Sequence, residues 1–236
     1  MATYVLIPGA GSDAWYWHLV VARLQGLGQR AIPVDLPCAD DDAGFAEYRD
    51  AVLRDVRDQA AGEELGEVIV VGHSLGGFTA PLVCEPLGAA LLVFVAAMVP
   101  RIGEPPGDWW TNTGHHAAHV ANLRRAGRDP DAEFDPIWEF FHDVPAQVVA
   151  DTLARGEGQQ SSAPFERPYP LETWPDVPSR FLLCRNDRFF PADFLRRVVE
   201  DRLGIRAEEL ASGHLPMLAH PDELVAQLET YRLERV

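Results

Sequence analysis

A serine stands in a glycine-rich run, Gly72-His73-Ser74-Leu75-Gly76-Gly77, directly after the apolar segment Val68–Val71. The apolar segment predicts a buried strand, and the residues after the run predict a helix. A serine on such a tight turn is held in a strained backbone geometry that exposes its hydroxyl, and the flanking glycines prevent collisions with neighbouring elements. The Gly-x-Ser-x-Gly pattern alone arises by chance in roughly a tenth of chains of this length. The context therefore favours Ser74 as a nucleophile over a plain strand–turn–helix junction.

A serine hydroxyl is a poor nucleophile and needs a base, and the chain has eight histidines. In sites built on a strand–turn–helix serine, the chain order is serine, then acid, then histidine. Only His214 and His220 follow the last predicted strands. His214 lies in a loop just past a strand, whereas His220 precedes Pro221 and is expected to start the last helix. We therefore predict His214 as the base.

The base needs a carboxylate that holds its tautomer and stabilises the imidazolium. Asp187 follows the predicted strand Phe181–Cys184 by a few residues. The preceding strand offers no alternative, because no carboxylate follows it before Glu104. The competing interpretation is a solvated loop aspartate paired with Arg185 or Arg188, since surface ion pairs of this kind are common. We predict Asp187 as the acid.

Two aligned N–H donors are needed for the oxyanion that forms during acyl transfer. One is expected from the backbone of Leu75, at the start of the helix after the serine. The other is expected from Ala10, in the small-residue turn Pro8–Ser12 after the first strand. A phosphate-binding turn is the alternative, because Gly9-x-Gly11 matches part of a dinucleotide fingerprint whose third glycine is replaced by the tolerated Ala14. The serine motif weighs against that alternative.

Short apolar strands alternate with helices along most of the chain. The predicted strands are Tyr4–Ile7, Ala31–Val34, Val68–Val71, Leu91–Ala97, Phe181–Cys184 and Ile205–Leu210. The predicted helices are Asp13–Leu27, Gly44–Ala61, Gly76–Leu87, Asp193–Leu203 and Asp222–Leu233. Apolar strands that are each followed by a helix predict an α/β fold, with a mostly parallel six-stranded sheet and helices on both faces. Right-handed crossovers then bring the loops that follow the strands to one edge of the sheet.

Residues 101–178 are too long for a loop between two strands. Helical stretches at His115–Arg125 and Pro145–Ala154 predict an inserted helical cap, with residues 1–100 and 179–236 as the core. Cap residues Trp109, Trp138 and His142, together with Gly9 of the core, are candidates for substrate binding. The helical spacing of Phe134, Trp138 and Phe141 is equally typical of ordinary cap packing. His115 and His119 stand four apart but lack the glutamate of the helical zinc motif, so no metal is predicted.

The chain has 236 residues and a net charge of −16, from 36 acidic residues and 20 basic residues that are all arginine. Such a surface disfavours nucleic acid and anionic lipid. The three cysteines favour a reducing compartment, although Cys38 could be exposed in its acidic loop. The apolar stretches suit neither a signal peptide nor a bilayer span. We expect a cytoplasmic protein whose partner is a small-molecule substrate, and a homodimer is compatible with the sequence.

The motifs together resemble those of α/β-hydrolases of the compact esterase type, related to plant methyl esterases and hydroxynitrile lyases. The matching segments are Val5–Ala10 with Trp15-Tyr16-Trp17, the Ser74 run, Cys184–Pro191 and Gly213–Pro221. The stretch 101–178 resembles the family mainly in position and length. The resemblance implies an α/β-hydrolase fold, the triad Ser74, Asp187 and His214, an oxyanion hole of Ala10 and Leu75, and no cofactor.

Departures from the family pattern narrow the expected chemistry. Most relatives have histidine where this chain has Pro8. Hydroxynitrile lyases have threonine at the place of Gly9 and lysine at that of Leu215, and without any lysine no such cation can stabilise cyanide. We expect a serine hydrolase that cleaves a small carboxylic ester through an acyl-enzyme. The alternatives are a carbon–carbon bond hydrolase or lyase on the same triad, and a ligand-binding receptor without turnover.

Overall fold

In the computed structural model, which describes residues 1–156 and 158–234, six strands form one sheet. The strand order is β2-β1-β3-β4-β5-β6, and every neighbouring pair is parallel. The strands are β1 (Ala2–Ile7), β2 (Arg30–Pro33), β3 (Glu67–His73), β4 (Ala89–Val95), β5 (Ser179–Cys184) and β6 (Glu208–Leu210). The predicted parallel sheet is confirmed.

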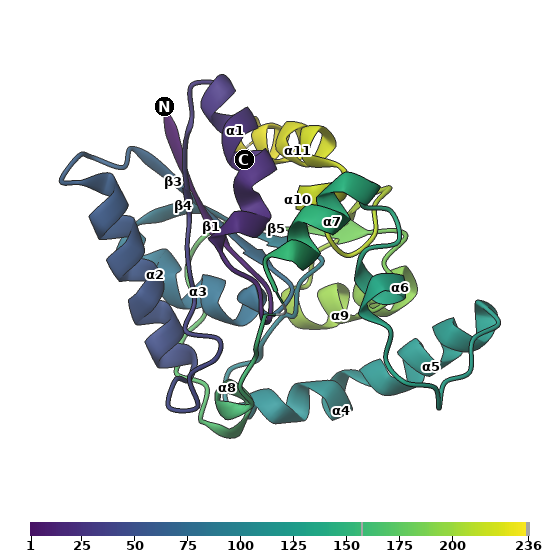
Figure 1. Cartoon of the computed structure of the whole chain (residues 1–236). Helices are drawn as coiled ribbons and strands as arrows, with labels where there is room; N and C mark the ends of the chain where they lie inside the picture. The colour runs from purple at the N-terminus through teal and green to yellow at the C-terminus, as the bar shows by residue number, and fades with distance from the viewer. Residues whose placement is uncertain (157, 235–236) are drawn as a thin grey trace.

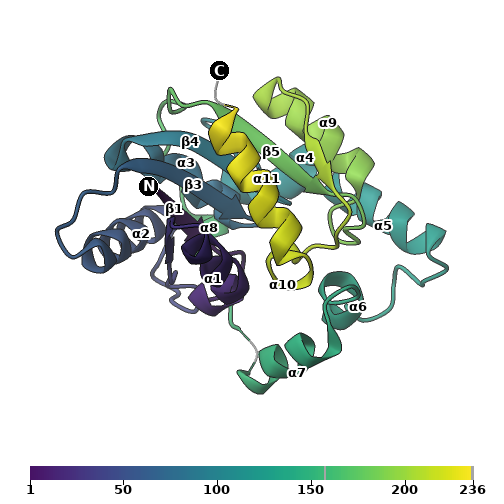
Figure 2. The ribbon, with the colours of Figure 1, turned by 90° about the horizontal axis from the view of Figure 1, so that it is seen from above.

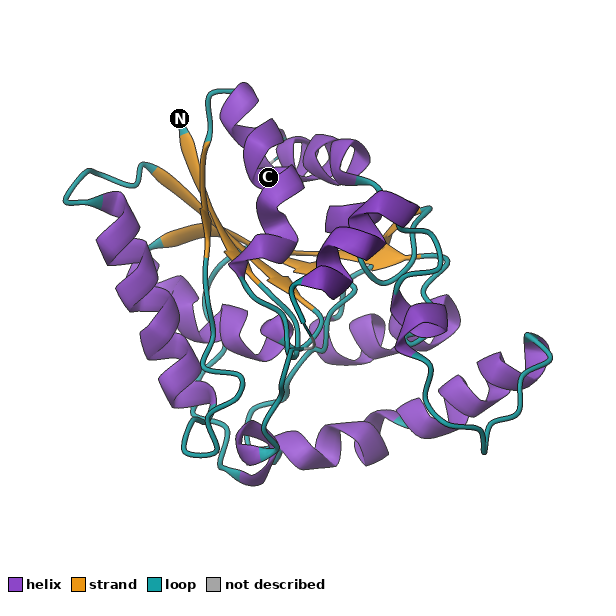
Figure 3. Ribbon diagram, in the orientation of Figure 1, coloured by secondary structure: helices purple, strands orange, loops and turns teal. Residues whose placement is uncertain are grey.

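Helices cover both faces of this sheet (Figures 1 and 3). On one face lie α2 (Phe45–Ala60), α3 (Gly76–Leu87) and α9 (Ala192–Leu203), and on the other lie α1 (His18–Gly26) and α11 (Pro221–Leu233). Because crossovers between parallel strands must pass over a face, this arrangement buries the sheet on both sides. The carboxyl ends of the strands consequently share one edge.

Alternation along the strands divides the core into two layers. In β1, Val5 and Ile7 join the apolar cluster under α2, α3 and α9, whereas Tyr4 and Leu6 join the cluster under α1 and α11. All six residues of β1 are buried. An apolar run without polar alternation is therefore what a strand covered on both faces requires.

The segment 101–178 separates β4 from β5. Its helices within the described residues are η2 (Pro106–Asp108), α4 (Trp109–Thr113), α5 (His115–Arg125), α6 (Pro136–Phe140), α7 (Ala146–Ala154) and α8 (Ala163–Glu166). Figure 2 shows α6 and α7 beside α10 (Pro216–Ala219), the short helix that follows the His214 loop. The division of the chain into core and cap stays a prediction.

Three local expectations need correction or adjustment. The helix expected from Asp13 begins as the 3₁₀ helix η1 (Ala14–Trp17), with the Asp13 carboxylate accepting the Trp15 N–H at 3.1 Å. The last strand is half as long as expected, because β6 begins only at Glu208. Cys38 is buried, and burial raises the pKa of its thiol, so it is not an exposed loop cysteine.

Among the described helices, none combines the length and hydropathy needed to cross a bilayer.

Candidate active site

Ser74 occupies the junction between β3 and α3, with a positive φ of 51°. This left-handed conformation is unfavourable for any residue with a side chain, so neighbouring elements must hold it. The end of β4 does so, because the Ser74 N–H donates to the Val95 carbonyl at 3.3 Å and the Met98 N–H donates to the Ser74 carbonyl at 2.9 Å. The predicted strained turn is present at this serine.

The glycines of the run allow the turn to pack against its neighbours. A Cβ atom on Gly72 would lie 2.7 Å from the Gly76 carbonyl oxygen, and one on Gly76 would lie 2.6 Å from the Pro8 carbonyl oxygen. A Cβ atom on Gly77 would lie 2.0 Å from the Met98 carbonyl oxygen. These are backbone atoms that cannot rotate away, so only glycine fits these positions.

We expect Gly77→Ala to lower the free energy of unfolding by about 3 kcal/mol, because the new methyl group forces α3 away from the end of β4. Gly26→Ala is the matched control, since nothing lies within 4 Å of its Cβ position and alanine favours helix by about 0.5 kcal/mol or more. Urea unfolding of both variants measures the difference. Equal stability of the two variants would contradict the packing argument.

Ser74, His214 and Asp187 form one line of hydrogen bonds. The Ser74 hydroxyl lies 3.1 Å from His214 Nε2, and His214 Nδ1 lies 2.7 Å from Asp187 Oδ2. The other carboxylate oxygen of Asp187 accepts the N–H groups of Phe189 and Phe190, each at 2.9 Å. The side chains of Asp187 and His214 are 0% and 5% exposed, so water competes little for these bonds.

The sheet explains why residues so distant in sequence meet here. Ser74 follows β3, Asp187 follows β5 and His214 follows β6. The loops after β5 and β6 are joined directly, because the Asn186 N–H donates to the Ser212 carbonyl at 2.9 Å. The structure therefore brings together the three residues that the sequence singled out.

His73 is a further buried residue at this edge. Burial, the main cause, and electrostatic repulsion from His214, the second, hold the pKa of His73 well below its ordinary value, so this imidazole is neutral. Its Nε2 lies 2.8 Å from the carbonyl oxygen of His214, which can only accept, so His73 Nε2–H donates this hydrogen bond. The residue before the serine thus supports the loop that carries the histidine.

The turn after β1 lies against the serine. A Cβ atom on Gly9 would be 2.9 Å from Ser74 Cβ, so the absence of a side chain permits this close approach. In the described residues, no hydrogen bond uses the N–H of Ala10 or of Leu75. The next amide, that of Gly11, instead donates to Gln160 Oε1 at 3.2 Å.

Aromatic rings surround the histidine. The ring centroids of Phe140, Phe190 and Phe189 lie 5.0, 5.4 and 5.9 Å from that of His214. Phe140 comes from α6, and the other two follow Asp187 in the loop after β5. These rings give the site an apolar surrounding in which electrostatic interactions are stronger than in water.

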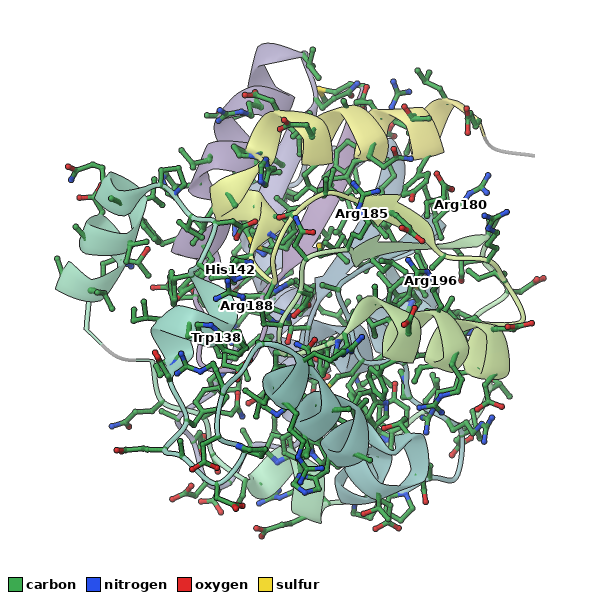
Figure 4. The ribbon with its side chains drawn as sticks, turned by 90° about the vertical axis from the view of Figure 1, so that its right-hand side faces the viewer. Trp138, His142, Arg180, Arg185, Arg188 and Arg196 are labelled. Atoms are coloured by element: carbon green, nitrogen blue, oxygen red, sulfur yellow. The ribbon has the colours of Figure 1, made fainter. Side chains whose placement is uncertain are left out.

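The three candidate residues of the 101–178 segment have different surroundings. Trp109 is completely buried in the core, donates its indole N–H to the Val99 carbonyl at 2.9 Å, and contacts Phe190 rather than an open cleft. The guanidinium groups of Arg128 and Arg188 both lie over the Trp138 ring, 4.6 and 4.5 Å from its centroid. His142 lies near Arg188 and Trp138 (Figure 4), where burial, and then the charge of Arg188, lower its pKa.

His115 and His119 stack with their ring centroids 5.6 Å apart, but their nitrogens have other partners. His115 Nε2 donates to the Phe189 carbonyl at 2.8 Å, and His119 Nε2 lies 2.8 Å from the Glu139 carboxylate. The described residues contain no group of three or more side chains suited to hold a metal ion. The pair therefore packs between α5, α6 and the Phe189 loop.

Known proteins are similar to this chain over nearly its whole length. The alpha/beta hydrolase family profile matches residues 4–228. The chain is 37% identical to the probable esterase PIR7A of rice (Oryza sativa subsp. indica), over 94% of this chain and 93% of that protein. It is 26% identical to methylesterase 7 of Arabidopsis thaliana, over 95% and 94% of the two chains. The crystal structure of polyneuridine aldehyde esterase superposes with a TM-score of 0.78 at 21% identity, covering 98% of this chain and 99% of that one. The resemblance expected from the motifs is confirmed: this chain belongs to the alpha/beta hydrolase family.

Proposed function

We propose that this protein hydrolyses small carboxylic esters, with Ser74 as the nucleophile, His214 as the general base and acid, and Asp187 as the orienting carboxylate. The observation that carries the proposal is the continuous hydrogen-bond line from Asp187 to a serine at positive φ. The esterase names of the rice and Arabidopsis relatives support the same reaction class.

In the first half of the reaction, His214 Nε2 takes the proton from Ser74 as its oxygen attacks the ester carbonyl. The N–H groups of Ala10 and Leu75, which are free of partners within the described residues, would bind the developing oxyanion. His214 then gives its proton to the departing alcohol, and the acyl group stays on Ser74. The buried Asp187 stabilises the imidazolium throughout.

In the second half, His214 takes a proton from water, and the resulting hydroxide attacks the acyl-enzyme. The tetrahedral intermediate collapses, the carboxylic acid leaves, and the proton returns to the Ser74 oxygen. The rings of Phe140, Phe189 and Phe190 around His214 keep bulk water from the imidazole. This cycle uses only side chains, backbone amides and water.

Covalent labelling with a fluorophosphonate tests the proposal. We expect one adduct per chain, located on the Ser74 peptide by mass spectrometry, together with turnover of aryl acetates. Ser74→Ala should take up no label, while the control Ser162→Ala, which changes an exposed serine, should label like the wild type. A folded wild-type protein that neither labels nor hydrolyses esters would contradict the proposal. Turnover of vinylogous diketones instead of esters would favour carbon–carbon bond cleavage.

A further inference from the structure

A carboxylate from the 101–178 segment contacts the loop that carries His214. Asp143, which follows α6, accepts the Gly213 N–H on its Oδ2 at 2.5 Å. The same oxygen lies 3.5 Å from the Ser212 hydroxyl and 3.6 Å from His220 Nε2. The Asp143 side chain is only 19% exposed, so water replaces these contacts poorly. This second carboxylate therefore binds the residue directly before the proposed base.

The contact is also close in space. A Cβ atom on Gly213 would lie 2.5 Å from Asp143 Oδ1 and 2.7 Å from His142 Cε1. The φ of Gly213 lies outside the left-handed region, so the need for glycine here comes from packing alone. His142 and Asp143 thus pack directly against the backbone of the loop that carries His214.

The supports of His214 come from different parts of the fold. The His214 imidazole is held by Asp187, and the backbone carbonyl of His214 accepts a hydrogen bond from His73. Asp187 follows β5 and His73 is the last residue of β3, so both belong to the sheet edge. Asp143 instead belongs to the segment between β4 and β5. Asp143 accepts the N–H of the Ser212–Gly213 peptide unit, whereas Asp187 and His73 bind groups of His214 itself. The direction of the imidazole toward Ser74 therefore depends on all three contacts.

We propose that Asp143 is a positioning residue that holds the Ser212–Gly213 peptide, directly before the Gly213–His214 link, and so sets the approach of His214 Nε2 to the Ser74 hydroxyl. The inference rests on the proposed function of Ser74 and His214. A hydrogen bond to a carboxylate is strong, and its removal leaves the Gly213 N–H with no other partner among the described residues. The Ser212–Gly213 peptide unit is then held through its carbonyl, which accepts the Asn186 N–H at 2.9 Å. Displacement of a base by about 1 Å is enough to lower a rate up to 100-fold.

The test compares Asp143→Ala with Asp143→Asn in the full chain. We expect Asp143→Ala to lower kcat for an aryl acetate about 10- to 100-fold with KM changed less than about 2-fold, and to slow fluorophosphonate labelling of Ser74 by the same factor. Asp143→Asn keeps an acceptor for the Gly213 N–H and should restore kcat to within about 3-fold of wild type. The control is Asp151→Ala, which removes an exposed carboxylate of α7 in the same segment and should change neither constant.

Wild-type kcat in a folded Asp143→Ala variant would overturn the inference, and so would equal losses in the alanine and asparagine variants. If Asp143→Ala fails to fold, Asp143→Ser replaces it, because the shorter side chain cannot reach the Gly213 amide. It should show the same loss of kcat. Labelling of wild-type Ser74 is measured first, so that failure of the proposed function is distinct from failure of the positioning role. Without that labelling, both are wrong.

Discussion

Replacement of His214 by alanine is expected to lower kcat for ester hydrolysis by about 10⁵- to 10⁶-fold, while the fold is retained. His214 Nε2 accepts the hydrogen bond of the Ser74 hydroxyl at 3.1 Å, and no other imidazole is bonded to that hydroxyl in the described part of the chain. Without the base, the serine at its ordinary acidity is almost entirely protonated and attacks esters very slowly. Ester turnover under saturating substrate measures the loss, and thermal unfolding verifies the fold.

His116→Ala is the matched control for this variant. His116 is exposed on α5, and its removal should leave kcat unchanged. The sequence also offered His220 as a base, but the structure places its Nε2 3.6 Å from Asp143 instead of at the serine. If His214→Ala kept a tenth of the wild-type rate, the assignment of the base would be wrong.

The site was predictable from sequence where the sheet positions it. Ser74 and Asp187 follow short apolar strands, and His214 follows the three-residue strand β6. Parallel strands bring the residues at their carboxyl ends to one edge. The strand that precedes each residue therefore predicted that the serine, the acid and the histidine meet at this edge, without knowledge of any loop geometry. The glycines around Ser74 also indicated the tight strand–turn–helix junction, since the contacts at Gly76 and Gly77 leave no room for a side chain.

The 101–178 segment could not be predicted in the same way. No strand of the sheet lies within the described residues of this segment to determine where its short helices pack. An aromatic residue in these helices can therefore belong to the core or line a substrate pocket. Trp109 illustrates the ambiguity, because it is completely buried and bonded to the Val99 carbonyl. Asp143 gave no signal at all, since its role comes from a contact with Gly213, 70 residues away. Sequence spacing carries no information about such a pair.

Substitution of the proposed acid, Asp187, is expected to cause the second large loss of activity, and the contacts of its carboxylate explain why. We expect Asp187→Asn to lower kcat about 10⁴-fold with little loss of stability. Asp187 Oδ1 accepts two backbone N–H groups, those of Phe189 and Phe190, and an amide nitrogen cannot accept them. The oxygen of the asparagine must therefore stay at that position, which turns its NH₂ group toward His214 Nδ1.

An NH₂ group at Asp187 Oδ2, 2.7 Å from His214 Nδ1, donates a hydrogen bond where the carboxylate accepted one. The neutral imidazole then carries its proton on Nε2, so it can no longer accept the proton of Ser74. The geometry of the site is preserved, but the hydrogen bond between His214 Nε2 and the Ser74 oxygen is reversed and proton transfer from the serine is blocked. For this reason kcat falls more steeply than stability. Fluorophosphonate labelling should slow by the same factor, and the exposed control Asp176→Asn should leave both rates at the wild-type value. A loss below 10-fold in Asp187→Asn would contradict the assignment of Asp187 as the carboxylate that orients the histidine.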